Sequence, residues 1–349
     1  MSVRIGVVGV GRMGKLHCRV LSEMPGVDLT CVVDSDPAVA TAAAEEFGTV
    51  PAELLEAVDL VDAAIIATPT SVHFETAKPF ISAGKHVLIE KPIADNVESA
   101  QQLIDLAKQT SSIIQVGHTE RFNPVFEAIK KFDISPKFIE AHRISPFTFR
   151  SADIGVVLDM MIHDIDLILM MVRSELADVQ AVGVSVLGAA EDIANARLTF
   201  ANGCVANLTA SRLAIKSERK MRIFSEQAYL SVDYGKQVGI VVKKDENLDL
   251  LQMAKQMDAE DLSELAGKVD YTKLIKVEQL QITSDVEPLR KQAEAFYQCI
   301  MGLSEPAVPA EAGLAAIRCA SAIIDAIKSH RWDGVNSQRI GPDILKQES

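Results

Sequence analysis

The sequence predicts an α/β fold in which a doubly wound parallel sheet is followed by a second α/β domain with a large, open, mostly antiparallel sheet. Short runs rich in Val and Ile alternate with helical patterns over the first third of the chain. A glycine-rich loop joins the first run to the first helical pattern. Beyond about residue 125 the strand-like segments lengthen and alternate apolar with polar residues, which is typical of a sheet with one wetter face.

Length and charge limit the number of domains and the kinds of partner. The chain has 349 residues, and at about 150 residues per domain this favours two domains, which we expect at residues 1–122 and 123–349. Lys and Arg total 35 against 48 Asp and Glu, so the net charge is −13. An acidic surface argues against nucleic-acid binding, which needs a basic patch.

The cysteines and the apolar runs predict a cytoplasmic protein. Five scattered cysteines contain no C-x-x-C pair, so we expect reduced, buried thiols and no metal site. No apolar run has the length of a membrane span, and we expect no signal peptide.

The N-terminal elements follow from the spacing of apolar residues. Strands buried on both faces show little alternation, and the expected ones are Val3–Val8, Asp28–Val33, Leu60–Ala67, Lys85–Ile89 and Ile113–Val116. The expected helices are Met13–Ser22, Pro37–Phe47, Ser71–Ala83 and Asn96–Thr110.

The C-terminal half is expected to contain longer strands and closing helices. The strands are Phe138–Ile144, Val179–Leu187, Ile193–Phe200, Cys204–Arg212, Met221–Glu226, Tyr229–Tyr234 and Val238–Lys243. Asn202-Gly203 predicts a hairpin turn. The expected helices are a charged one over Glu246–Lys268 and two closing ones over Pro288–Met301 and Ala310–Ser329.

A glycine loop predicts a dinucleotide site. Gly9, Gly11 and Gly14 stand in a G-x-G-x-x-G pattern, with Arg12 and Met13 between the last two. The first glycine permits a tight turn, the second lets a pyrophosphate approach the backbone, and the third lets helix and strand pack closely. The helix that follows offers free N–H groups to the phosphates. This strand–loop–helix context predicts a Rossmann domain.

Asp34 predicts that the cofactor is NAD. It ends the second strand, 20 residues beyond Gly14, where an acidic side chain accepts hydrogen bonds from the adenosine ribose and repels a 2′-phosphate. Thr68 and Pro69 follow a later strand, so we expect them to line the cofactor, with helix capping as the alternative. We place His73 with these cofactor-binding residues, although packing or capping suits it better than catalysis.

Glu90-Lys91-Pro92 predicts a lysine in the cleft. A residue before proline is pushed out of helical geometry, which would aim the Lys91 ammonium at a substrate hydroxyl. We expect Glu90 and Lys91 beside the cofactor, and a solvated surface lysine is the alternative.

Residues 157–172 predict a helix with a catalytic face. At ~100° per residue, Asp159, His163 and Asp166 share a stripe beside an apolar one. His163 suits a general base, because imidazole titrates near neutral pH and adjacent carboxylates would orient it and favour its protonated form. A structural histidine with ion-paired neighbours is the alternative.

Together these motifs resemble the glucose–fructose oxidoreductase/inositol dehydrogenase (Gfo/Idh/MocA) family. The matching residues are Gly9–Gly14, Asp34, Thr68-Pro69, Glu90-Lys91-Pro92, Gly117-His118, Arg121-Phe122-Asn123-Pro124, Asp159 and His163. The resemblance implies a Rossmann domain that binds NAD or NADP, and catalytic roles for Lys91, Asp159 and His163. It also implies an open sheet that forms the interface of a homodimer or homotetramer.

Longer phrases are similar to members of the family that oxidise the C3 hydroxyl of UDP-N-acetylglucosamine: Val116–Pro124, Phe138–Arg143, Met161–Leu167 and Asp192–Arg197. This similarity implies a sugar-nucleotide substrate held by Lys91, Arg121, Asn123, Arg143, Arg150, Asp159 and His163. Phosphates bind cations with matching geometry, so we expect at least one of Arg143, Arg150 and Arg212 to contact the diphosphate, with carboxylate pairing as the alternative.

Two other functions stay open from the sequence. One is a dehydrogenase or reductase of a free sugar, inositol or related polyol. The other is a non-catalytic NAD(H)-sensing protein, against which the presence of Lys91 and His163 argues.

Overall fold

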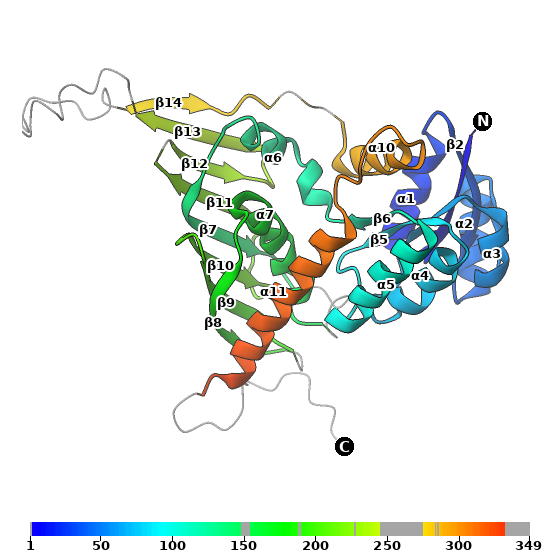
Figure 1. Ribbon diagram of the computed structural model, residues 1–349, viewed down its shortest axis with the longest axis horizontal. Coiled ribbons are helices and arrows are strands. Elements are labelled where there is room, and N and C mark those ends of the chain that lie inside the picture. The colour runs from blue at the N-terminus through cyan, green and yellow to red at the C-terminus, as the bar shows by residue number, and fades with distance from the viewer. Residues whose placement is uncertain are drawn as a thin grey trace, which may run out of the picture.

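The computed structural model describes residues 2–147, 154–187, 190–226, 228–244, 275–282, 284 and 286–331. These residues form a parallel sheet in the N-terminal third and a mostly antiparallel sheet in the C-terminal half, with helices against both (Figure 1). The predicted α/β fold is confirmed. Arg150 and the helix expected over Glu246–Lys268 lie outside the described residues.

The first sheet has six parallel strands in the order β3-β2-β1-β4-β5-β6. They are β1 (Val3–Val8), β2 (Val27–Val33), β3 (Val50–Pro51), β4 (Ala63–Ile66), β5 (His86–Glu90) and β6 (Ile114–Gly117). The helical elements between them are α1 (Arg12–Ser22), α2 (Pro37–Phe47), α3 (Leu54–Leu60), η1 (Thr70–Val72), α4 (His73–Ser82) and α5 (Val97–Thr110). The order reverses between β1 and β4, and ligands bind at such a switch point, beyond the carboxyl ends of the strands.

Burial explains why these runs form strands. β4 is buried at every position, and apolar side chains from the two faces of the sheet pack into separate core clusters. The strand expected over Leu60–Ala67 begins only at Ala63, because the residues before it form α3. The backbone N–H of Glu53 donates to the Glu56 carboxylate at the start of that helix, a capping contact that the sequence analysis overlooked.

The second sheet has eight strands in the order β14-β13-β12-β11-β7-β10-β9-β8. They are β7 (Pro136–Ile144), β8 (Leu176–Val184), β9 (Ile193–Phe200), β10 (Val205–Ser211), β11 (Glu218–Ser225), β12 (Ala228–Asp233), β13 (Val238–Lys244) and β14 (Ile275–Gln279). Only β7 and β10 pair in parallel among these strands. The predicted hairpin joins β9 to β10, with Gly203 at φ +83°.

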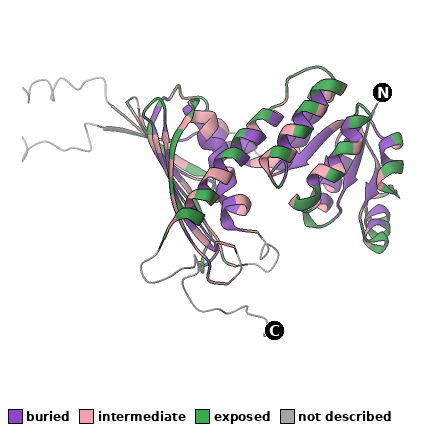
Figure 2. Ribbon diagram, turned by 60° about the horizontal axis from the view of Figure 1, so that its bottom comes forward, coloured by how far each residue is buried: buried purple, intermediate pink, exposed green. Residues whose placement is uncertain are grey.

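One face of this sheet is covered by helices and the other is more open (Figures 1 and 2). The covering elements are η2 (Thr119–Phe122), α6 (Pro124–Ile129), η4 (Val157–Met161), α7 (Ile162–Val172) and α11 (Ala310–Ser329). On β9, Ala196 and Leu198 are fully buried, whereas Asn195 and Arg197 are exposed. The alternation predicted for this half is confirmed.

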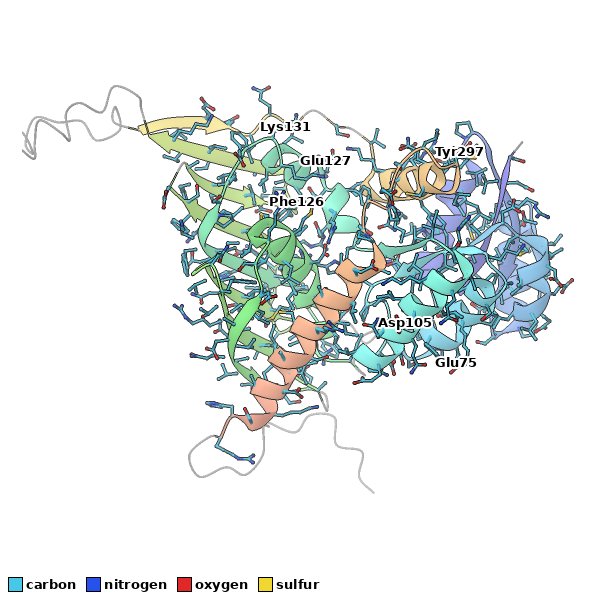
Figure 3. All side chains as sticks on the ribbon, in the orientation of Figure 1. Glu75, Asp105, Phe126, Glu127, Lys131 and Tyr297 are labelled. Carbon is cyan, nitrogen blue, oxygen red and sulfur yellow. The ribbon has the colours of Figure 1, made fainter. Side chains whose placement is uncertain are left out.

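The C-terminal helices reach back to the first sheet. α10 (Pro288–Ile300) lies beside α1, and its Leu289 and Phe296 share the core cluster of β1. Lys291 of α10 forms an ion pair with Glu127 of α6; Figure 3 labels Glu127. α11 packs on both α5 and β8. The domain boundary at residue 122 stays a prediction, because residues far beyond it complete the core of the first sheet.

The five cysteines are buried thiols without disulfides. Burial raises the pKa of Cys18 to about 12 and that of Cys31 to about 11, so both stay protonated. Across the described ranges, no helix combines the length and the apolar character needed to cross a membrane.

Candidate active site

The glycine loop between β1 and α1 fits the pyrophosphate of a dinucleotide. Gly9 takes φ +85°, and a Cβ there would lie 2.8 Å from the backbone nitrogen of Thr68. A Cβ at Gly14 would collide with the Gly9 carbonyl oxygen, so α1 packs directly on the loop. At Gly11 a Cβ would meet nothing within 4 Å, which leaves that side open to a ligand. α1 begins at Arg12 without a side-chain cap, so its first N–H groups can bind phosphate.

Asp34 lies beside this loop, just after β2. Its Oδ2 accepts the backbone N–H of Val10 at 2.9 Å, and its Oδ1 accepts that of Asp36 at 3.1 Å. A carboxylate oxygen has two lone pairs, so each oxygen can still accept a hydrogen bond from a ribose hydroxyl. Asp34 therefore lies beside the glycine loop with room for further hydrogen bonds, and its role in selecting NAD stays a prediction.

Thr68 and Pro69 follow β4 at the same edge, and His73 supports them from beneath. The Nε2 of His73 lies 2.9 Å from the carbonyl oxygen of Thr68, and its Nδ1 lies 2.8 Å from that of Pro92. Burial lowers the pKa of His73, although both carbonyl contacts oppose the shift. With both ring nitrogens directed at backbone oxygens, His73 positions the loops on either side, and its predicted contact with the cofactor stays a prediction.

β5 brings Glu90 and Lys91 to this edge. Glu90 is buried, and its Oε1 lies 2.7 Å from Nε2 of His17 on α1. Burial alone would raise the pKa of Glu90, but the contact with His17 and the nearby charge of Lys91 lower it. Glu90 is therefore ionised at neutral pH. The peptide bond between the next two residues, Lys91 and Pro92, is cis.

Lys91 reaches from the first sheet to the helical segment on the second. Its Nζ donates to the backbone oxygen of Asp159 at 2.6 Å and to the carboxylate Oδ1 of Asp159 at 3.2 Å. The Lys91 and Asp159 side chains are 18% and 28% exposed. An ammonium has three N–H groups, so one N–H of Lys91 is left for a substrate oxygen.

The segment 157–172 is helical as predicted, but its polar residues do not form one stripe. The first five residues make the π-helical turn η4, and α7 begins at Ile162. A π turn closes i→i+5 bonds, so it changes the phase between Asp159 and His163. Asp159 pairs with Lys91, while the Nδ1 of His163 has no hydrogen-bond partner in the described part of the chain. The expectation that Asp159 orients His163 is therefore wrong.

A pocket of about 470 Å³ lies between the two sheets, and His163 lines it. Met13 and Leu16 of α1 contribute one side of the pocket, and the first turn of α10 contributes another. Thr119, Glu120 and Asn123, strands β7 and β11, and the turn between β12 and β13 supply the remaining lining. The pocket therefore extends from the start of α1 to His163.

His163 is held as a neutral imidazole. Burial and the positive charges of Lys91 and Arg143 lower its pKa well below the ordinary value of 6.5. The expected effect of adjacent carboxylates is absent because Asp159 and Asp166 are paired with cations instead. A neutral ring can accept a proton at neutral pH, which general base catalysis requires.

Most of the arginines expected at the substrate are paired inside the protein. Arg121 donates to both carboxylate oxygens of Asp166, at 2.7 and 2.6 Å. Arg212 donates to Asp192 at 2.6 Å and to the backbone oxygen of Ile154 at 2.8 Å. Buried guanidinium groups need such partners. Neither Arg121 nor Arg212 lines the pocket described above; for Arg212 this agrees with the alternative of carboxylate pairing, and the substrate contact of Arg121 stays a prediction.

Arg143 and Asn123 do line the pocket, but both are tied to neighbouring carboxylates. Arg143 is 5% exposed, donates to both oxygens of Asp164 at 2.8 and 2.9 Å, and donates to Glu120 Oε1 at 3.1 Å. Asn123 Nδ2 donates to Glu120 Oε2 at 3.2 Å, and its Oδ1 accepts the N–H of Val125 at the start of α6.

One side chain that lines the pocket was not predicted from the sequence. Arg219 of β11 lines the pocket, and its side chain is 53% exposed. The available signal was the period of two along β11, because Met221 and Ile223 are buried on the same face. His118 is 1% exposed and neither ring nitrogen has a partner within the described ranges, and burial lowers its pKa.

Comparisons with known proteins agree with this architecture. Residues 3–118 match an oxidoreductase family with an NAD-binding Rossmann fold, and residues 136–231 match the GFO/IDH/MocA C-terminal domain. The chain is 39% identical over 236 residues to the UDP-N-acetylglucosamine 3-dehydrogenase of Acidithiobacillus ferrooxidans, which is 66% of this chain and 74% of that protein. A solved structure of that enzyme superposes with a TM-score of 0.83 at 31% identity and covers 94% of this chain and 98% of its own.

Two further relatives differ in substrate. An inositol 2-dehydrogenase of Rhizobium meliloti is 31% identical over 194 residues, or 52% of this chain and 58% of that protein. A levoglucosan dehydrogenase in complex with NADH has a TM-score of 0.79 at 19% identity, covers 94% of this chain and 97% of its own, and shares the fold.

Proposed function

This chain belongs to the Gfo/Idh/MocA family of NAD-binding oxidoreductases, and from that premise we propose that it oxidises the C3 hydroxyl of a nucleotide sugar such as UDP-N-acetylglucosamine to the keto sugar. It is an NAD-dependent dehydrogenase that acts on a CH–OH group. The observation that carries the proposal is a pocket that extends from the start of α1 to a neutral His163, with the charge of Lys91 close enough to lower the pKa of His163.

Oxidation removes a hydride and a proton from the same secondary alcohol. The carbon loses a hydride and the oxygen loses a proton, and bound NAD supplies the hydride acceptor. His163 accepts the hydroxyl proton on a ring nitrogen and becomes imidazolium. The remaining N–H of Lys91 donates to the substrate oxygen and stabilises the negative charge that develops there.

The opposite assignment would make Lys91 the base and His163 a hydrogen-bond donor. Asp159 argues against it, because its backbone oxygen and its carboxylate both accept N–H bonds from Lys91. Asp159 therefore engages two of the three N–H groups of Lys91. Asp159 is thus a positioning residue for Lys91.

A second candidate function is oxidation of inositol or another free polyol. The similarity to the inositol 2-dehydrogenase of Rhizobium meliloti favours it. Such a substrate has the same secondary alcohol and would use Lys91 and His163 in the same way.

A substrate panel distinguishes the two. The purified protein is incubated with NAD and, separately, UDP-N-acetylglucosamine, UDP-N-acetylgalactosamine, N-acetylglucosamine, myo-inositol and levoglucosan, and NADH absorbance is followed. We expect the highest kcat/KM with UDP-N-acetylglucosamine and a 3-keto product by mass spectrometry and NMR. Faster oxidation of myo-inositol than of either UDP-sugar would refute the nucleotide-sugar assignment and leave the dehydrogenase class intact.

A further inference from the structure

Arg219 faces the pocket with its hydrogen-bond donors unused. Its side chain is 53% exposed, and its ion-pair contact with Glu120 Oε1 is 3.6 Å long, which is beyond hydrogen-bond distance. A guanidinium has five N–H donors. Over the ranges that the structure describes, none of those of Arg219 reaches an acceptor within hydrogen-bond distance.

The carboxylates that line the pocket are already engaged by other groups. Glu120 accepts hydrogen bonds from Arg143 at 3.1 Å and from Asn123 at 3.2 Å. Both oxygens of Glu287 accept from Arg19, at 2.9 and 2.7 Å. These acids are therefore poor competitors for Arg219.

The strand register explains why Arg219 lacks a close partner. Arg219 on β11 is paired directly with Arg143 on β7, and like charges in such positions destabilise a sheet. Asp164 and Glu120 bond to Arg143, whereas Arg219 turns to the pocket. An anion bound there would compensate the second charge of the pair.

The space beyond Arg219 suits an elongated ligand. A neighbouring hollow of about 620 Å³ shares Gln237 with the pocket and is also lined by Lys220 and Lys236. Gln237 takes φ +54° in the turn between β12 and β13, a conformation that non-glycine residues adopt at a cost and that is common at ligand-binding positions. The two hollows meet at Gln237, and the second is also lined by Asp233.

We propose that Arg219 binds the diphosphate of a nucleotide-linked substrate, with the sugar toward His163 and the nucleoside toward Gln237 and Lys236. This inference rests on the proposed function and names the group that distinguishes a nucleotide sugar from a free sugar. A guanidinium fork binds phosphate oxygens in pairs, so Arg219 is a specificity-determining residue. It does not touch the reacting hydroxyl.

The test compares Arg219→Ala and Arg219→Lys with the matched control Arg318→Ala, which removes an exposed arginine from α11. We expect Arg219→Ala to raise the KM for UDP-N-acetylglucosamine about 10- to 100-fold, the range for loss of hydrogen bonds to a charged group. The kcat should stay within about threefold, because Arg219 is not placed at the reacting atoms. Arg219→Lys should keep part of the affinity, and Arg318→Ala should match the unmodified protein.

Direct binding separates this inference from the proposed function. Calorimetry on the enzyme–NADH complex uses UDP, glucuronate and N-acetylglucosamine as probes. Of the three probes, we expect only UDP to bind more weakly to Arg219→Ala, by about the same factor as the rise in KM. A stronger effect on glucuronate would assign Arg219 to a sugar carboxylate and overturn the diphosphate assignment.

Each remaining outcome either supports or overturns the role of Arg219. An active unmodified protein with unchanged KM in Arg219→Ala overturns the inference and leaves the function standing. Binding of UDP that depends on Arg219, without turnover of any UDP-sugar, supports the subsite and refutes the proposed reaction. If Arg219→Ala lowered kcat and the affinity for NADH as well as raising KM, Arg219 would be structural and the inference would be overturned. Arg219→Gln, which keeps most of the side-chain length without the charge, would then show the same losses.

Discussion

Replacing His163 tests the proposed chemistry most directly. General base catalysis is typically worth 10²- to 10⁴-fold in rate, or about 2.7 to 5.4 kcal/mol at 1.36 kcal/mol per factor of ten. The structure favours a substantial effect, because His163 lines the pocket and its Nδ1 has no hydrogen-bond partner in the described part of the chain. We expect His163→Ala to lower kcat by this factor. The affinity for NADH should be preserved, because the glycine loop and Asp34 lie on the other domain.

The pH dependence gives a second, independent reading of the same residue. The pKa of His163 is lowered well below 6.5 by burial and by the charges of Lys91 and Arg143. The neutral ring is the active form, so activity is lost only as the pH falls through that lowered value. We therefore expect kcat/KM to remain level from neutral pH down past 6.5, with the acidic limb below it.

The assay is a stopped-flow measurement of NADH formation with saturating UDP-N-acetylglucosamine between pH 5 and 9. Primary isotope effects with C3-deuterated substrate identify whether hydride transfer is being observed. Lys91→Ala serves as the comparison, because it should also lose rate but retain an acidic limb from His163, moved to higher pH since the charge of Lys91 no longer lowers that pKa. Retention of more than a tenth of the turnover in His163→Ala, or an acidic limb centred near 6.5 in the unmodified protein, would refute this reasoning.

Two further predictions concern the cofactor and stability. Asp34→Ala should weaken NAD binding and reduce the preference for NAD over NADP, because it removes the carboxylate that accepts hydrogen bonds from the ribose and repels a 2′-phosphate. Steady-state kinetics with both cofactors measure this preference. Equal use of NAD and NADP by the unmodified protein would contradict the prediction. Asp166→Asn should reduce the free energy of unfolding by about 3 to 5 kcal/mol, because it leaves Arg121 as a buried charge with a weakened partner. Urea denaturation measures that loss, and Asp62→Asn at the exposed pair with Arg4 is the control expected to lose much less. Equal losses at the two pairs would contradict the burial argument.

The sequence by itself determined the features that depend on neighbouring residues. Gly9 is required where the backbone takes a positive φ, and the pattern of apolar residues fixes which runs are strands and helices, so the glycine loop, most of the parallel strands and helix 157–172 were predictable. The position of Asp34 beside the loop was predictable from the number of residues between Asp34 and the glycine loop. These properties are local, because steric limits and periodicity act over a few residues.

Only the tertiary structure decided which partner each polar side chain meets. Asp159, His163 and Asp166 share one helical segment, yet the π turn and the packing of that segment against Lys91 and Arg121 separate them. Arg143 and Arg219 face each other on β7 and β11, but the fold brings the carboxylates of Glu120 and Asp164 close to Arg143. Only the tertiary structure shows this difference between the two arginines. Such contacts join residues far apart in the chain, and their energies depend on burial and distance, which periodicity alone does not contain.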